Sequence, residues 1–136
     1  MSRENVEAVY NAYAAFNEGD LAGVLSWFHA DAVYRDAIHQ AVEGEAGAFR
    51  GHDGIRQWWR DLHDHYEDLN TEVLEVRDLG EQLIVVFVVR GRGKGSGIAL
   101  DTRLAQVVKM RQGKVIEMRD YFSLEEALQA VGLADG

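Results

Sequence analysis

The sequence predicts an α+β fold in which a curved, cone-shaped antiparallel sheet wraps around helices and encloses a cavity. Two observations predict it. Before Thr71, apolar residues recur at the spacing of amphipathic helices. From Thr71 onward, they follow the period of two that is typical of strands, in segments separated by turns. The chain has 136 residues, 47% of them hydrophobic, which suits a single domain with its own core, and we assign residues 1–136 to it.

Two helices are expected at the N-terminal end. Ser2 can cap the first helix. Its apolar stripe consists of Val6, Val9, Tyr10, Tyr13 and Phe16. Gly19 suits the end of this helix, since glycine readily adopts the left-handed conformation of a C-terminal cap. Asp20 can then cap a short second helix. Its apolar residues are Leu21, Val24, Leu25 and Phe28.

A strand, a loop and a third helix are expected next. The strand covers residues 32–38. One of its faces carries Tyr34, Asp36 and Ile38. Residues 40–49 have no clear period, so we interpret them as a loop. Asp53 can cap the third helix. The apolar stripe of that helix consists of Ile55, Trp58, Trp59, Leu62, Tyr66 and Leu69, and we interpret its two tryptophans as core and cavity wall.

The rest of the chain is expected to form four strands and a closing helix. The strands are 71–79, 82–90, 98–110 and 114–122. The run from Leu83 to Val89 has no polar residues at alternate positions, so both faces of that strand should be covered by other parts of the protein. Ser123 and Glu126 have the spacing of a capping box, and they open a short helix that ends at Gly132.

The composition excludes several classes of function. Asp and Glu outnumber Lys and Arg by 23 to 14, and a net charge of -9 repels nucleic-acid backbones. The absence of cysteine excludes disulfides, thiol catalysis and zinc–cysteine sites. No apolar run is long enough for a membrane-spanning helix, and the N-terminal residues lack a signal pattern. We therefore expect a soluble, cytoplasmic protein that binds neither nucleic acid nor membranes.

Neither a cofactor nor a metal site is predicted. The run from Gly91 to Gly97 fails the spacing of phosphate-binding and dinucleotide-binding loops, and we interpret it as a flexible hairpin loop. The histidines form no metal-binding motif. His39 and His52 flank the loop before the third helix, and that loop could form a lid over the cavity. Either side chain could then reach a ligand, and we interpret both as solvated side chains.

Asp120 is the strongest candidate for a chemical role. On its strand, it shares a face with Ile116, Met118 and Phe122. A carboxyl group among apolar side chains has a raised pKa or finds a polar partner. When it is held near neutrality, it can act as a general acid or base. The alternative is a structural aspartate that is bonded to a loop or exposed near the strand end.

Asp36 and Tyr13 are two further candidates. Asp36 lies where the sheet should meet the helices, and its carboxylate could take a proton from a bound carbon acid. The alternative is a strand-end aspartate bonded to backbone amides. The Tyr13 hydroxyl could donate to a ligand carbonyl or to a carboxylate, or it could pack in the core with an incidental hydrogen bond. Tyr13, Asp36 or Gln106 could lie within hydrogen-bond reach of Asp120.

Several stretches together resemble the SnoaL-like domains of the nuclear-transport-factor-2-like superfamily. They are Tyr13 to Asp20 (YAAFNEGD), Phe28 to Asp36 (FHADAVYRD), Phe49 to Ile55 (FRGHDGI) and Gly113 to Phe122. The resemblance covers nearly the whole chain. It implies the cone-shaped fold and a homodimer formed through the outer face of the sheet, for which the run from Leu83 to Val89 would supply apolar surface. It implies no single reaction, because this fold hosts enzymes, ligand binders and scaffolds.

Similarity to the ketosteroid isomerases of this superfamily implies specific roles for two residues. Tyr13 matches their tyrosine before the Asn-x-Gly-Asp turn, and Asp36 matches their aspartate base. Their second acid, which is protonated and donates a hydrogen bond, would fall near Ala105 and is therefore missing.

The stretch Arg119-Asp120-Tyr121-Phe122 is similar to one in limonene-epoxide hydrolases. There the aspartate serves as an acid, which implies the same role for Asp120. The arginine and second aspartate of those enzymes would fall near Phe87 and Val89, so this set is also incomplete.

The resulting hypothesis is a cofactor-free acid/base enzyme, isomerase-like or cyclase-like, that acts on a small, largely apolar, carbonyl-bearing substrate in the cavity. Asp120, Asp36 and Tyr13 are the predicted catalytic residues. The predicted substrate-binding residues are Tyr34, Trp58, Gln106, Met118 and Phe122. The alternative is a non-catalytic small-molecule-binding or dimerisation module of the same fold. Convergence of Asp36 and Asp120 on a cavity, with no internal partner for either, favours the enzyme, whereas a salt bridge to each favours the alternative.

Overall fold

A computed structural model describes residues 2–37 and 44–133 of the chain, and within them it confirms the α+β fold. The helices are α1 (Ser2–Asn17), α2 (Leu21–Trp27), α4 (Gly51–His65) and α5 (Leu124–Ala130), with a short 3-10 helix η1 (Gly44–Gly47). The strands are β1 (Phe28–Arg35), β2 (Phe49–Arg50), β3 (Tyr66–Asp78), β4 (Gln82–Gly93), β5 (Ala99–Arg111) and β6 (Lys114–Tyr121).

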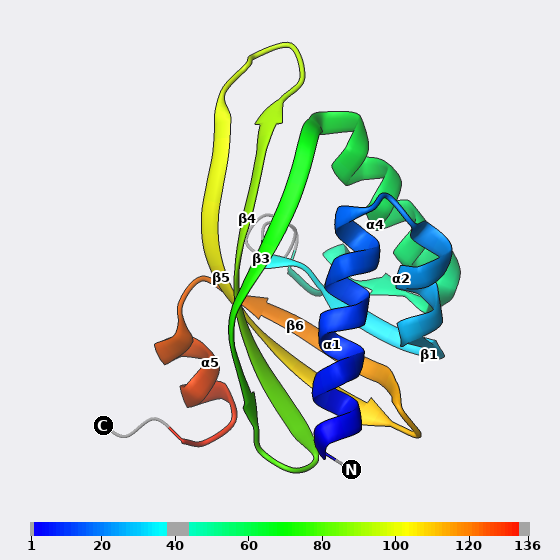
Figure 1. Ribbon diagram of the computed structural model, residues 1–136, viewed down its shortest axis with the longest axis vertical. Helices are drawn as coiled ribbons and strands as arrows, with labels where there is room; N and C mark the ends of the chain where they lie inside the picture. The colour runs from blue at the N-terminus through cyan, green and yellow to red at the C-terminus, as the bar shows by residue number, and fades with distance from the viewer. Residues whose placement is uncertain (1, 38–43, 134–136) are drawn as a thin grey trace.

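The six strands form one mixed, largely antiparallel sheet. Their order is β2-β1-β6-β5-β4-β3, and only β1 and β6 run parallel to each other. Helices α1, α2 and α4 lie on one side of the sheet, and α5 lies on the other side (Figure 1). The predicted order of helices, strand, helix and antiparallel meander is therefore confirmed.

The turn between α1 and α2 follows the predicted chemistry. Gly19 has a positive φ of 73°, which a glycine adopts without steric cost. Asp20 caps α2, since its carboxylate accepts a hydrogen bond from the backbone N–H of Gly23 at 2.9 Å. Tyr10 is half exposed, unlike Val9, so the buried stripe of α1 is narrower than predicted.

Three predicted boundaries are wrong. Strand β4 continues to Gly93 and pairs with β5, so the first three residues of the predicted hairpin loop 91–97 belong to the strand. Strand β1 begins at Phe28 and ends at Arg35, so Asp36 follows the strand, and Ile38 lies outside the described residues. Helix α4 ends at His65, although the apolar stripe continues to Leu69. From Tyr66 onward the chain is extended and pairs with β4, so the backbone hydrogen bonds of the sheet override the helical pattern there. At its start, α4 includes Asp53 in its first turn, and Arg50 occupies the cap position.

A β-bulge at Ile116 changes which side chains of β6 face inward. Met110 of β5 is opposite Val115, but the next β5 residue, Lys109, is opposite Glu117. Ile116 is thus the extra residue, and the alternation resets after it. Val115 is fully buried in the main core, and Ile116 is only partly buried. The prediction that Ile116 lines the same wall as Asp120 is wrong for this reason.

The sheet has a hydrophobic core on each face. On β4, Leu83, Val85 and Phe87 join the large core under α1, α2 and α4. Ile84 and Val86 point the other way and pack with Ala105, Val107 and residues of α5. Helix α5 therefore provides the second cover that the apolar run of β4 needs, and the run by itself does not require a partner chain.

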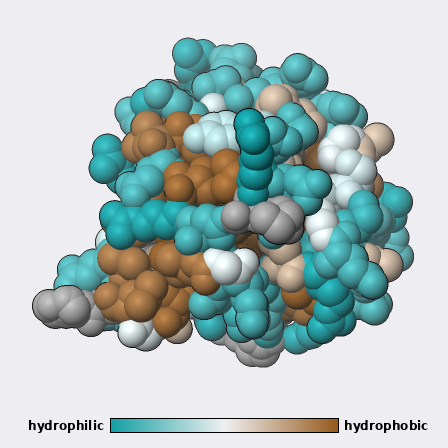
Figure 2. All heavy atoms as spheres, turned by 60° about the horizontal axis from the view of Figure 1, so that its bottom comes forward, coloured by the Kyte–Doolittle hydropathy of each residue, from teal (hydrophilic) through white to brown (hydrophobic). Residues whose placement is uncertain are grey.

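The surface is mixed on the side of the molecule that carries α5. Figure 2 shows brown areas of apolar atoms there, divided by hydrophilic atoms. On the outer face of β4, Arg90 forms ion pairs with Glu72 and Asp101. Among the described helices, none has the length and apolar character needed to cross a membrane.

Candidate functional site

A pocket opens between the inner face of the sheet and the helices α1, α2 and α4. Its volume is about 130 Å³, and its wall is largely apolar and aromatic. All eight predicted site residues line it: Tyr13, Tyr34, Asp36, Trp58, Gln106, Met118, Asp120 and Phe122. Their places are now known, and their chemical roles remain predictions.

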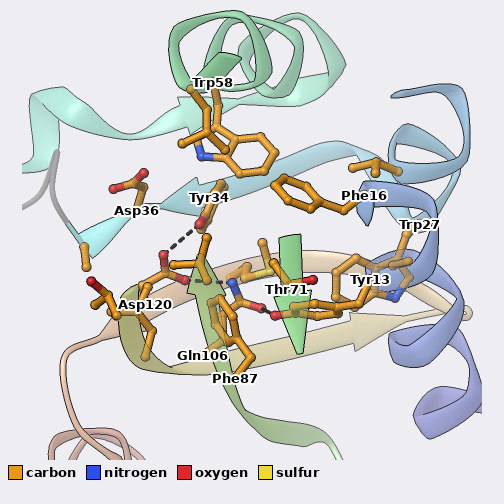
Figure 3. Close-up of a pocket in the computed structure, with 18 of the residues that line it drawn as sticks. Tyr13, Phe16, Trp27, Tyr34, Asp36, Trp58, Thr71, Phe87, Gln106 and Asp120 are labelled. Atoms are coloured by element: carbon orange, nitrogen blue, oxygen red, sulfur yellow. Dashed lines mark hydrogen bonds between the residues drawn. The ribbon is translucent and has the colours of Figure 1, made fainter. Parts of the chain in front are cut away.

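Asp120 lies at the polar end of this pocket, with 7% of its surface exposed. The hydroxyl of Tyr34 donates to its Oδ2 at 2.7 Å, and Nε2 of Gln106 donates to its Oδ1 at 2.8 Å (Figure 3). The backbone N–H of Ala37 also donates to the carboxyl group. Each of these donors is electrically neutral, so Asp120 is not held by a salt bridge within the described residues.

This environment raises the pKa of Asp120 from its ordinary value of 3.8 to about 7. Burial is the largest cause, because it disfavours the charged form, and the negative charge of Asp36 adds to it. The hydrogen bonds from Tyr34, Gln106 and Ala37 lower the pKa and offset part of the effect. The carboxyl group can therefore both take up and release a proton near neutral pH.

Gln106 connects Asp120 to Tyr13. The hydroxyl of Tyr13 donates to Oε1 of Gln106 at 2.5 Å, while the amide nitrogen of the same side chain faces Asp120. A chain of hydrogen bonds thus runs from α1 through β5 to β6 (Figure 3). Of the three predicted neighbours of Asp120, Gln106 contacts it directly, and Tyr13 reaches it only through Gln106.

Tyr13 and Tyr34 remain protonated when Asp120 titrates. Burial raises the pKa of each hydroxyl well above 10, and the charge of Asp120 raises it further. Both side chains can therefore act as hydrogen-bond donors throughout the neutral range.

Asp36 lies at the same end of the pocket as Asp120 (Figure 3). It is half-buried, and its charge acts on both Asp120 and Tyr34. The two aspartates thus converge on one pocket, which is one part of what the enzyme hypothesis expects. The other part, the absence of internal partners, is not met, because Asp120 accepts hydrogen bonds from Tyr34 and Gln106.

The predicted substrate-binding residues form different parts of the wall. Trp58 of α4 packs edge-on against Tyr34, with ring centroids 5.2 Å apart. Met118 is buried beside Asp120 on the inner face of β6. Phe122 is 54% exposed and forms part of the rim. Tyr34 contacts Asp120 directly, a contact that the sequence pattern did not indicate.

The position implied by the ketosteroid isomerase comparison requires a correction. Ala105 faces away from the pocket and packs under α5, because side chains alternate along β5. Its neighbours Leu104 and Gln106 face the pocket instead. Neither is an acid, so no carboxyl group stands at this point of the wall. Phe87 and Val89 also line the pocket, and both are apolar.

The histidines of the described residues have local roles. Nε2 of His52 lies 2.8 Å from the carbonyl oxygen of Phe28, which ties the start of α4 to β1, so its interpretation as a solvated side chain is wrong. His63 and His65 each contact a backbone carbonyl one helical turn earlier. Among residues 2–37 and 44–133, no group of three His, Asp or Glu side chains is arranged to hold a metal ion. His39 lies outside these residues.

Comparison with known proteins identifies the family. The family model of the SnoaL-like domain matches residues 9–118, and the chain belongs to this family. An uncharacterised protein of Mycobacterium tuberculosis is similar to it, with 28% identity over 124 residues, or 88% of each chain. The match defines the fold but no reaction.

Several solved structures have the same fold. An NTF2-like protein of unknown function from Burkholderia pseudomallei has a TM-score of 0.78 and 24% identity, covering 95% of this chain and 97% of its own. TerC, co-crystallised with polyporic acid, has a TM-score of 0.77 and 23% identity, with coverages of 96% and 97%. A protein of ketosteroid isomerase-like fold from Catenulispora acidiphila, in complex with trimethylamine, has a TM-score of 0.74 and 22% identity, with coverages of 94% and 94%.

Proposed function

We propose that this protein is a cofactor-free acid/base enzyme that moves a proton within a small, largely apolar, carbonyl-bearing substrate, as an isomerase or a cyclase does. The observation that carries the proposal is the buried carboxyl group of Asp120, which is surrounded by neutral donors and has a pKa of about 7. A general acid or base is most effective when its pKa lies near the working pH.

In the proposed reaction, the Asp120 carboxylate takes a proton from the carbon next to the substrate carbonyl. The electron pair of the broken C–H bond moves into the carbonyl group and leaves an enolate. A tyrosine hydroxyl donates a hydrogen bond to the enolate oxygen, and Tyr13 and Tyr34 both line the pocket with raised pKa values. Where the substrate has a C=C bond β,γ to the carbonyl, the enolate extends over that bond. Asp120 then returns the proton to the γ carbon, the C=C bond moves next to the carbonyl, and the isomerisation is complete. In a cyclase, the enolate carbon attacks a second carbonyl group of the same molecule, the π bond of that carbonyl breaks, and the resulting alkoxide takes the proton from Asp120.

The pocket supports a ligand about the size of one ring. Its volume is about 130 Å³, close to that of engineered apolar cavities of about 150 Å³ that bind benzene. The aromatic side chains of Phe16, Trp58 and Phe87 suit an apolar body, and the polar groups gather at one end. Two relatives of the same fold were crystallised with small molecules, polyporic acid and trimethylamine.

A second candidate is a small-molecule-binding module without catalysis. Both carboxyl oxygens of Asp120 already accept hydrogen bonds from side chains, as in a structural aspartate. In that case, the pocket would bind an apolar ligand and Asp120 would not exchange protons with it.

Deuterium exchange separates the two candidates. In heavy water, the enzyme should accelerate the loss of the protons next to the carbonyl of small cyclic ketones such as cyclohexanone, measured by proton NMR. Asp120→Asn should slow that exchange by roughly 100-fold or more, the usual scale for removing a general base. Asp101→Asn, which changes an exposed aspartate on the outer face of the sheet, is the matched control and should retain the parent rate. Equal rates for the parent and the Asp120 variant, or no acceleration of any ketone, would refute the acid/base proposal.

We also infer a homodimer formed through the outer face of the sheet. Apolar atoms exposed on the α5 side of the molecule support it (Figure 2). Light scattering at micromolar concentration should give twice the mass of the chain, and a monomer under these conditions would exclude this assembly.

A further inference from the structure

The side-chain amide of Gln106 stands between two groups with different parts in the proposed chemistry. Its oxygen accepts from Tyr13 at 2.5 Å, and its nitrogen donates to Asp120 at 2.8 Å. Gln106 is itself buried, with 4% of its surface exposed, so water does not compete readily for these contacts. In this arrangement, the hydroxyl proton of Tyr13 is used within the protein and is not directed at a ligand.

We propose that Gln106 is a positioning residue whose amide turns over when Asp120 gains a proton, and that this turn releases the hydroxyl proton of Tyr13 to a ligand in the pocket. The inference deepens the proposed function and rests on it for its meaning in catalysis. The turn itself requires no substrate.

The argument begins with the donors that surround Asp120. Tyr34, Gln106 and the N–H of Ala37 all donate to its carboxyl group, an arrangement that suits a carboxylate, which only accepts. A proton on Oδ1 turns this oxygen into a donor. It then faces the amide nitrogen of Gln106, which is also a donor, and a buried donor without an acceptor costs about 1 to 3 kcal/mol.

A half-turn of the Gln106 amide removes this conflict. The amide oxygen and nitrogen have similar sizes, so the turn needs little repacking. Oε1 then accepts the new proton of Asp120, and Nε2 donates to the hydroxyl oxygen of Tyr13. The Tyr13 O–H is left without its former acceptor and can rotate toward the pocket, whose wall Tyr13 helps to form.

The groups that face Asp120 do not prevent this half-turn of the Gln106 amide. Titratable neighbours are Tyr34 on β1, Asp36 after it, and Tyr13 on α1, which acts over a longer range. The neighbouring strand β5 contributes the neutral Gln106, directly opposite Asp120. Within residues 2–37 and 44–133, the Tyr13 hydroxyl is hydrogen-bonded to the neutral Gln106 and to no charged side chain.

The consequence is that Tyr13 becomes able to donate a hydrogen bond to the substrate at the step in which Asp120 gains the proton. The substrate proton reaches Asp120 as negative charge develops on the carbonyl oxygen. At the same step, the amide of Gln106 turns and Tyr13 becomes available to donate to that oxygen. Donors directed at the developing charge are a major source of rate acceleration in enzymes.

Tyrosine NMR without ligand tests this inference. The protein is labelled with ¹³C at the ring carbon that bears each hydroxyl, titrated between pH 5 and pH 9, and assigned with Tyr→Phe variants. Tyr34 and Tyr13 should both shift with the midpoint of Asp120. In Gln106→Met, which keeps the side-chain length but has no amide, Tyr34 should still shift, whereas Tyr13 should lose most of its response. The Tyr10 and Tyr121 signals, from outside the pocket, report whether this variant remains folded.

Asp120→Asn provides a second arm that does not depend on titration. Its amide nitrogen is a permanent donor toward Gln106, as protonated Asp120 would be. The Tyr13 signal of this variant should stay at the position that the parent shows at low pH. A Tyr13 signal that is insensitive to pH in the parent and unchanged in Asp120→Asn would overturn the inference, as would a full Tyr13 response in Gln106→Met. Failure of ketone exchange alone would contradict the proposed function and leave these results standing.

Discussion

The Asp120 carboxyl group is buried and has no positively charged partner among the described residues. These two conditions control its protonation. A neighbouring arginine or lysine would hold its pKa low, but its partners are Tyr34, Gln106 and a backbone N–H. Neutral donors stabilise the charged form by less than burial destabilises it, and Asp36 adds repulsion. Desolvation therefore has the larger effect, and the pKa rises to about 7.

The same residue should make stability depend on pH. In the unfolded chain, an aspartate has a pKa of about 3.9. Between that value and about 7 in the folded protein, the folded state holds a proton that the unfolded chain has released. The free energy of unfolding should therefore fall as pH rises through this window.

Asp120→Asn removes this dependence. From pH 5 to pH 8, the stability of the variant relative to the parent should increase by about 2 to 3 kcal/mol, measured by urea unfolding. Asp101→Asn should instead follow the parent curve. If the free energy of unfolding changed with pH in the same way for the parent and the Asp120 variant, Asp120 would have similar pKa values in the folded and unfolded states.

At the scale of elements, the end of α1 is attached to β3 by one side chain. The amide of Asn17 accepts from the backbone N–H and the hydroxyl of Thr71 and donates to its carbonyl oxygen, at 2.7, 2.8 and 2.9 Å. This contact fixes the helix that carries Tyr13 against the sheet. It joins residues 54 positions apart and has no periodic signature, so the sequence pattern did not indicate it.

Asn17→Ala should destabilise the protein by about 2 to 3 kcal/mol, because it leaves the backbone groups of Thr71 without partners in a partly buried place. Thr71→Val removes only the hydroxyl bond and should cost about 1 kcal/mol. Urea unfolding of the two variants provides the comparison. If Asn17→Ala costs no more than Thr71→Val, the backbone bonds are not what attaches α1 to β3.

The register of β5 and β6 is a second feature at this scale. The two strands are joined at Gln112 and Gly113, which both have positive φ, as in tight hairpin turns. Arg111 faces Lys114 beside this turn, and without a bulge the same register would place Arg119 opposite Gln106. The extra residue Ile116 brings Asp120 to that position instead. The hydrogen bond between Gln106 and Asp120 thus depends on one bulge.

For the whole molecule, periodicity predicted the types of the elements and, for parts of some strands, which side chains share a face. Alternation along the last strand was enough to place Met118 and Asp120 on one face, and all eight predicted site residues line one pocket. The hydrogen-bond pattern within the site was not predictable in the same way. It depends on the bulge at Ile116, and an extra residue in a strand has no distinct pattern in one sequence.

The boundary of α4 was missed for a related reason. Tyr66 and Leu69 continue the helical stripe, but they belong to β3, where pairing with β4 decides their conformation. The helical spacing of apolar residues competes here with strand pairing between distant parts of the chain. The pairing decides the conformation, and a short window of sequence does not reveal it.

The central claim, that Asp120 exchanges a proton near neutral pH, is tested most directly by an NMR titration of its carboxyl carbon. The parent protein is labelled with ¹³C at aspartate carboxyl groups, and Asp120→Asn assigns the signal. We predict a midpoint near pH 7, which moves still higher in Tyr34→Phe, because that variant removes a hydrogen bond that lowers the pKa. A midpoint near the ordinary value of 3.8, or below it, would contradict the account.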